Sequence, residues 1–126
     1  MTGPEWRLDG DRQTITVTFP TEPRVVLKLD AAQVDKMLEN LGHLRAVMQP
    51  GHAPNFAPGQ KVIGVRNPRW LAEPDMMQGD SLLHLRDPWF GWRHYLFPRE
   101  EATKLAHVLR NQVEAPPPTS AKTKPH

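Results

Sequence analysis

The sequence predicts an α+β fold, in which a mostly antiparallel sheet carries two helices packed on one face. Two stretches of alternating residues each precede an amphipathic helical stretch. These stretches align without a gap at an offset of 68 residues, so that Leu29 falls on Phe97 and Leu41 on Leu109. We therefore expect a pseudo-twofold duplication of a strand–strand–helix unit, because two units with one apolar face each can bury those faces together.

The first unit is expected over about residues 6–48. Residues 14–19 alternate between threonine and large apolar residues, and residues 25–29 continue as the second strand of a hairpin. Asp30 with Gln33 three residues later is a capping box, which predicts the start of a helix. The helix is expected to end at Pro50-Gly51. Its apolar stripe consists of Val34, Met37, Leu38, Leu41 and Leu44.

The second unit is expected over about residues 61–112, after a Pro/Gly-rich connection at 49–60. Residues 61–65 predict a strand, and Trp70-Leu71 indicates the start of a short one. Residues 81–86 and 93–97 predict a second hairpin, and residues 99–111 a second helix. We expect one domain over residues 1–114. Residues 115–126 hold four prolines and no large apolar residue, which predicts a disordered tail.

The register of the second hairpin can be predicted from the first. Val17 opposite Leu27 places the apolar residues of the first hairpin on one face. Carried over by 68 residues, the same register predicts the pairs Leu85–Tyr95, Leu83–Phe97 and Asp87–Arg93.

The other face of this second hairpin is the main functional lead. If the helices cover only the inner face, the aromatic and apolar side chains of this other face are exposed to water, and such patches mark interfaces. The alternative is that the connection at 49–60, or Trp70, folds over the patch. The candidate interface residues are His84, Arg86, Trp89, Phe90, Trp92, His94 and Leu96.

Catalytic and metal-binding motifs are absent from the sequence. His84 and His94 are expected to be diagonal neighbours on one face, but a zinc site needs a third ligand, so neither a metal nor another cofactor is predicted. Ser81 lacks the Gly-x-Ser-x-Gly context of a nucleophile, and no Gly-rich phosphate loop precedes a helix. The sequence therefore gives catalysis no positive support.

Charge and composition narrow the other function classes. The 126 residues include no cysteine, no signal-like N-terminus and no apolar run long enough for a membrane span, so a cytoplasmic protein is expected. The net charge of +2 comes from two tail lysines, which leaves residues 1–114 neutral. A neutral body argues against phosphate binding. The residues that would carry nucleic-acid binding are Lys61, Arg66, Arg69, Trp70, Arg86 and Arg93.

The leading hypothesis is a binding or assembly module whose aromatic outer sheet face meets a protein partner or a second copy. The runner-up is binding of single-stranded nucleic acid. Repeated strand-rich units each closed by a helix are similar in outline to the Whirly family of single-stranded DNA binders, a likeness of architecture without a shared residue motif. A third hypothesis is a small-molecule enzyme or sensor with a pocket between the two halves.

Overall fold

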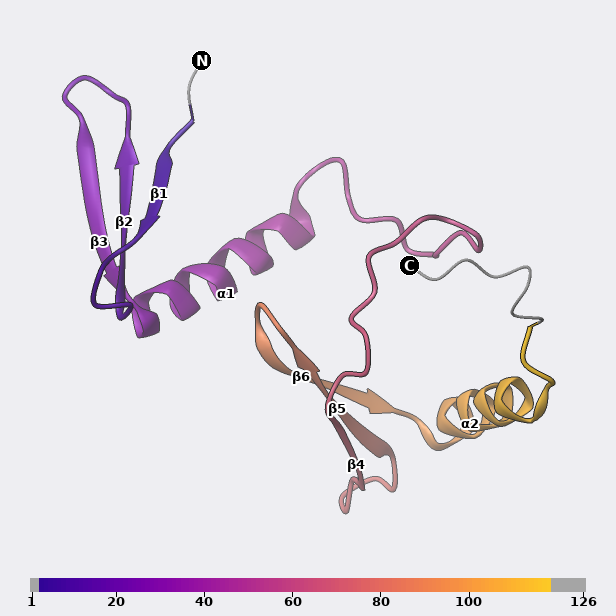
Figure 1. Cartoon of the computed structure of the whole chain (residues 1–126). Helices are drawn as coiled ribbons and strands as arrows, with labels where there is room; N and C mark the ends of the chain where they lie inside the picture. Colours follow the sequence, from indigo (N-terminus) through magenta and orange to yellow (C-terminus); the bar gives the residue numbers. More distant parts are fainter. Residues whose placement is uncertain (1–2, 119–126) are drawn as a thin grey trace. The chain divides into compact units, whose positions relative to one another are not determined.

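The computed structural model describes residues 3–118, and the chain divides into two compact units whose boundary falls between Gln60 and Lys61 (Figure 1). This boundary coincides with the end of the predicted connection at 49–60. Most of the predicted disordered tail, residues 119–126, lies outside the described residues. That residues 1–114 form one domain stays a prediction.

The first unit is a three-stranded antiparallel sheet followed by a helix. Its strands are β1 (Glu5–Leu8), β2 (Thr14–Phe19) and β3 (Val25–Asp30), in the order β1-β2-β3, and its helix is α1 (Ala31–Val47). The predicted pairing of Val17 with Leu27 is confirmed. Strand β1 was not predicted from the sequence, because its four residues are too few to establish an alternating pattern.

The second unit repeats this order of elements. Its strands are β4 (Trp70–Pro74), β5 (Ser81–Asp87) and β6 (Gly91–Phe97), and its helix is α2 (Arg99–Glu114). The α+β class and the antiparallel pairing are therefore confirmed. The strands that the structure describes form two three-stranded sheets, where the sequence analysis expected one sheet. That the repeated order of elements arose by duplication stays a prediction.

The predicted strand at residues 61–65 is wrong. These residues have no regular secondary structure, and the side chain of Ile63 is almost fully exposed. A strand exists only where its backbone N–H and C=O groups pair with a neighbour. Neither sheet of the described chain includes this segment, so its β-branched residues alone do not make it a strand.

Helix α1 begins at the predicted capping box. The Asp30 carboxylate accepts the backbone N–H of Gln33 at 2.8 Å, and the Gln33 side chain accepts the backbone N–H of Asp30 at 2.9 Å. These two bonds satisfy donors that have no partner within the helix. At the other end of the helix, the N–H of Met48 donates to the carbonyl of Arg45, before Pro50. Neither described helix has the length and apolar character of a membrane-spanning segment.

One face of the first sheet is apolar but is left largely open by its own helix. Helix α1 packs beside β3 and runs away from the end of the sheet (Figure 1). Among the described residues only Val17, in the central strand, is fully buried, with 2% of its surface exposed. We call this apolar face the inner face of the first sheet. Its residues are Trp6, Leu8, Ile15, Val17, Phe19, Val25, Leu27 and Leu29.

The opposite face of the first sheet is polar and is organised around Asp9. The hydroxyls of Thr14 and Thr16 donate to the two carboxylate oxygens of Asp9 at 2.6 and 2.8 Å. Arg7 and Lys28 lie 3.5 and 3.8 Å from the same carboxylate. The hydrogen bonds from Thr14 and Thr16, helped by the two cations, hold the pKa of Asp9 below its ordinary value of 3.8.

We predict that Asp30→Ala lowers the free energy of unfolding by about 1 kcal/mol, because it removes both bonds of the capping box. Urea unfolding followed by circular dichroism measures the loss. The matched control is Asp35→Ala, on the exposed surface of α1 beyond its first turn. Equal effects of the two substitutions would show that the capping box contributes nothing specific.

We predict that acid removes the stabilising contribution of Asp9. Because the pKa of Asp9 is lower in the folded than in the unfolded chain, its contribution is fully present above pH 3.8 and is lost as pH falls through the folded pKa. The stability difference between the wild-type chain and Asp9→Asn should therefore shrink as the pH falls below 3.8. Urea unfolding at each pH tests this, and a difference that stays constant contradicts it.

Candidate functional site

The register of the second hairpin differs from the predicted one by two residues. Leu83 pairs with Tyr95, and the predicted pairs Leu85–Tyr95, Leu83–Phe97 and Asp87–Arg93 are wrong. The reason is the length of the turn: three residues, 88–90, connect β5 to β6, whereas five residues, 20–24, connect β2 to β3. A slip of two residues leaves every side chain on its face, so the predicted sorting of residues between the two faces is confirmed.

Asp87 shapes this turn instead of pairing with Arg93. Its carboxylate accepts the backbone N–H groups of Trp89 at 2.8 Å and Phe90 at 3.0 Å. Gly91 then closes the turn with a φ of +79°, a conformation that suits glycine. The freed guanidinium of Arg93 lies 4.8 Å above the centre of the Phe90 ring, a cation–π contact. Trp89 and Phe90 thus belong to the turn and not to the strands.

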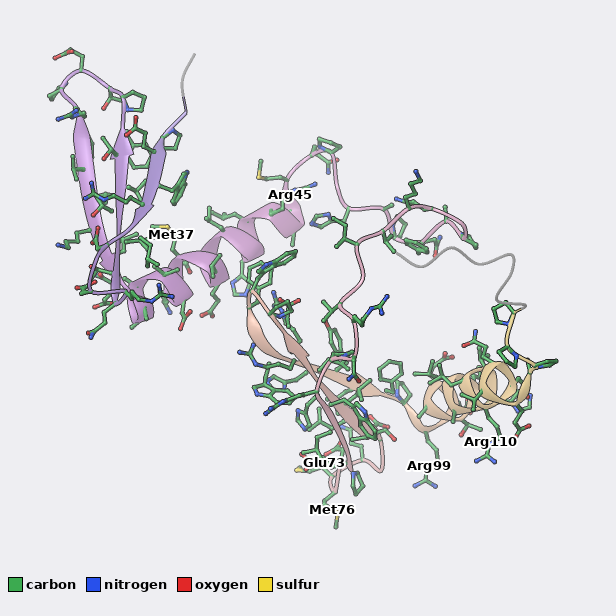
Figure 2. All side chains as sticks on the ribbon, in the orientation of Figure 1. Met37, Arg45, Glu73, Met76, Arg99 and Arg110 are labelled. Carbon is green, nitrogen blue, oxygen red and sulfur yellow. The ribbon has the colours of Figure 1, made fainter. Side chains whose placement is uncertain are left out.

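Nine residues in three rows make up the face that carries the candidate interface, which we call the outer face. The pairing of β4 with β5 continues to Arg69, whose carbonyl accepts the N–H of Arg86 at 2.9 Å. Figure 2 shows Glu73 on β4, near the loop that bears Met76. The first row is Arg69, Arg86 and Trp92; the second is Leu71, His84 and His94; the third is Glu73, Leu82 and Leu96.

Apolar side chains on the outer face are open to solvent. About half of the surface of Leu71, Trp92 and Leu96 is exposed, with 59% for Leu96. Helix α2 packs beside β6 and leaves these side chains uncovered. The outer face therefore offers an aromatic and aliphatic surface that its own unit does not cover.

A chain of three hydrogen-bonding side chains crosses the middle of this surface. Nε2 of His84 lies 3.1 Å from Oε1 of Glu73, and Nδ1 of His84 lies 2.7 Å from Nδ1 of His94. The two rings are directly opposite each other, where the sequence analysis expected diagonal neighbours. Only 17% of the His84 side chain is exposed. Glu73 thus orients His84, which in turn orients His94.

Metal binding at this arrangement would compete with its hydrogen bonds. Both ring nitrogens of His84 already have partners, and a metal ion would have to displace one of them. Within residues 3–118, no group of three or more histidine or acidic side chains is arranged to hold a metal ion.

The candidate nucleic-acid residues do not gather on one surface of the sheet. Trp70 and Arg93 lie on the inner face of the second sheet, opposite the outer face, whereas Arg69 and Arg86 lie on the outer face. The remaining two, Lys61 and Arg66, lie in the segment before β4 that has no regular secondary structure.

The two outer-face residues on β4, Leu71 and Glu73, were missed as site residues by sequence reasoning. Their strand was predicted to begin at Trp70-Leu71 but was not followed further. A signal was present: Pro68 and Pro74 bracket the segment, and prolines commonly bound an edge strand. Alternation from Arg69 then places Leu71 and Glu73 on one face.

We predict that Gly91→Ala and Gly42→Ala change stability in opposite directions. Alanine at position 91 is forced to a positive φ and should cost about 1 kcal/mol. A Cβ at Gly42, within helix α1, meets no atom within 4 Å, so alanine there should stabilise the protein by about 0.5–1 kcal/mol. Thermal unfolding measures both, and a stabilising Gly91→Ala would contradict the turn geometry.

Comparison with known proteins adds no further constraint, so the surface chemistry must carry the functional argument. No protein-family model, no curated protein and no solved structure matches this chain.

Proposed function

We propose that this chain is a protein-assembly module and that the outer face of its second sheet is the docking surface. One observation carries the proposal: Leu71, Trp92 and Leu96 stand exposed on one sheet face that their own helix leaves uncovered. Clustered apolar and aromatic side chains of this kind typically mark protein interfaces.

The first sheet provides an internal comparison. Its equivalent face carries threonines and the ion pairs of Asp9 with Arg7 and Lys28, which suits contact with water. The second sheet has the same three-stranded order but presents tryptophan and leucine there. Because both faces have the same place in their units, the difference in side chains points to a role beyond folding of the sheet.

The chemistry of the outer face favours a protein over a nucleic acid. Stacking binders combine aromatic rings with a continuous run of cations. On the outer face the two arginines share the first row with Trp92, but Glu73 lies in the third row and the histidine pair in the second. A carboxylate on the surface repels phosphate, whereas a protein partner can pair with charges of both signs.

We predict that a photoreactive benzoylphenylalanine at Trp92 forms adducts with a polypeptide in irradiated cells. The matched control places the same group at Val26, which is also exposed but lies on the polar face of the first sheet. Mass spectrometry of the adducts identifies the attached chain. A position 92 that yields no more polypeptide adduct than position 26 would overturn the proposal.

A binding measurement distinguishes this proposal from the rival function, binding of single-stranded nucleic acid. Fluorescence anisotropy of a labelled single-stranded oligonucleotide at low salt should show no binding by the purified chain. Micromolar or tighter binding that weakens steeply with added salt would instead assign the surface to nucleic acid.

A further inference from the structure

We propose that the outer face docks onto the outer face of a second copy of this chain, across a two-fold axis that lies in the interface perpendicular to the strands. This inference rests on the proposed function and names its partner. It follows from the order of charges along the three rows, which makes the surface complementary to itself.

The charges of the outer face are separated by row. Arg69 and Arg86 both lie in the first row, and Glu73, the acidic residue of the nine, lies in the third. Arg69 immediately precedes β4 and Glu73 lies within it, so the two flank Leu71 on the outer face. A partner suited to this surface therefore needs an acid facing the first row and a cation facing the third.

A second copy supplies that pattern when the rows are reversed. Rotation about an axis through the second row, perpendicular to the strands, places Arg69 against Glu73 of the second copy, and Glu73 against its Arg69. The same rotation places Trp92 against Leu96 of the second copy, so the aromatic ring meets an exposed leucine, and it places Arg86 against Leu82 without an opposing charge. A two-fold interface requires this self-complementarity, in which each contact occurs twice.

The other axis that keeps the strands of the two sheets aligned is disfavoured by the same charges. In aligned packing the strands of facing sheets lie within about 30° of each other, and a two-fold axis that gives such packing runs along or across the strands. An axis along the central strand keeps each row on itself and places Arg86 against Arg86 of the second copy. Like charges placed opposite each other in a closing interface repel, so the axis across the strands is selected.

The size of the surface predicts a weak, reversible dimer. Three strands about 4.8 Å apart, with three rows about 6.8 Å apart, cover on the order of 300 Å². Standard interfaces bury about 800 Å² on each partner, so this surface belongs to the small, transient class. Weak association is therefore expected, and the two Arg69–Glu73 contacts make up a large part of so small an interface.

Charge reversal tests the geometry directly in the full-length chain. Sedimentation velocity over a concentration series should show wild-type dimerisation, weakened at least tenfold by either Arg69→Glu or Glu73→Arg. The double variant R69E/E73R should restore affinity to within about threefold. An equimolar mixture of the two single variants should also associate, because every reversed charge then faces its opposite. Glu100→Arg, an exposed acid on α2, is the matched control and should leave dimerisation unchanged.

Each alternative result overturns a defined part of the inference. Glu73→Arg also breaks the bond to His84, but Arg69→Glu does not, and an unfolded variant could not restore association in the mixture. A wild-type chain that stays monomeric to about 500 µM would exclude the second copy as partner. If position 92 nevertheless gave adducts with a different polypeptide, the proposed function would stand with a foreign partner. Dimerisation insensitive to both charge reversals would exclude this axis.

Discussion

The rest of the structure depends on one packing constraint: one helix beside one strand cannot cover a three-stranded sheet. In the first unit the stripe of α1 is half-buried at Val34 and Met37, near β3, and becomes exposed at Leu41 and Leu44 farther along the helix. Helix α2 shows the same trend, from a half-buried Ala102 to an exposed Val113. Each buried methylene contributes about 0.8 kcal/mol, so apolar faces left open are a large unused source of stability. Any further cover for them would have to come from outside the unit.

The two sheets share this constraint but differ in how their remaining faces are made. On the polar face of the first sheet, the carboxylate of Asp9 accepts hydrogen bonds from two hydroxyls and forms ion pairs with two cations. The polar groups around Asp9 thus have partners within the face, so binding another protein there would add little free energy. The second sheet places one hydrogen-bonded chain, Glu73–His84–His94, among leucines and a tryptophan. On that face the glutamate and the two histidines have hydrogen-bond partners, whereas the tryptophan and leucines stay exposed, a combination that favours association with a protein partner.

Local patterns in the sequence were sufficient for the features that repeat at short range. The capping box at Asp30, the register of β2 with β3 and the sorting of side chains on β5 and β6 follow from spacing alone. The pairing of β5 with β6 did not, because a turn two residues shorter shifts the register while preserving the faces. Strand β1 was not predicted, whereas the segment at 61–65 was predicted as a strand and is unpaired. Pairing, and not residue type, decides whether a segment is a strand. For the same reason Glu73, on a strand whose length was underestimated, was missing from the candidate site.

The polar groups of the outer face have a consequence for specificity. A surface made only of leucine and tryptophan could dock in many registers, because the hydrophobic effect has no direction. Polar groups penalise every register in which they lose water without gaining a partner. In the second row His84 is largely buried and held by Glu73 on one side and His94 on the other, so the rings are fixed in place before any partner arrives. Arg69 at one end of the face and Glu73 at the other then favour the proposed reversed register, in which Arg69 meets Glu73 and Trp92 meets Leu96. On this view the apolar residues supply the attraction and the ordered polar residues select the geometry.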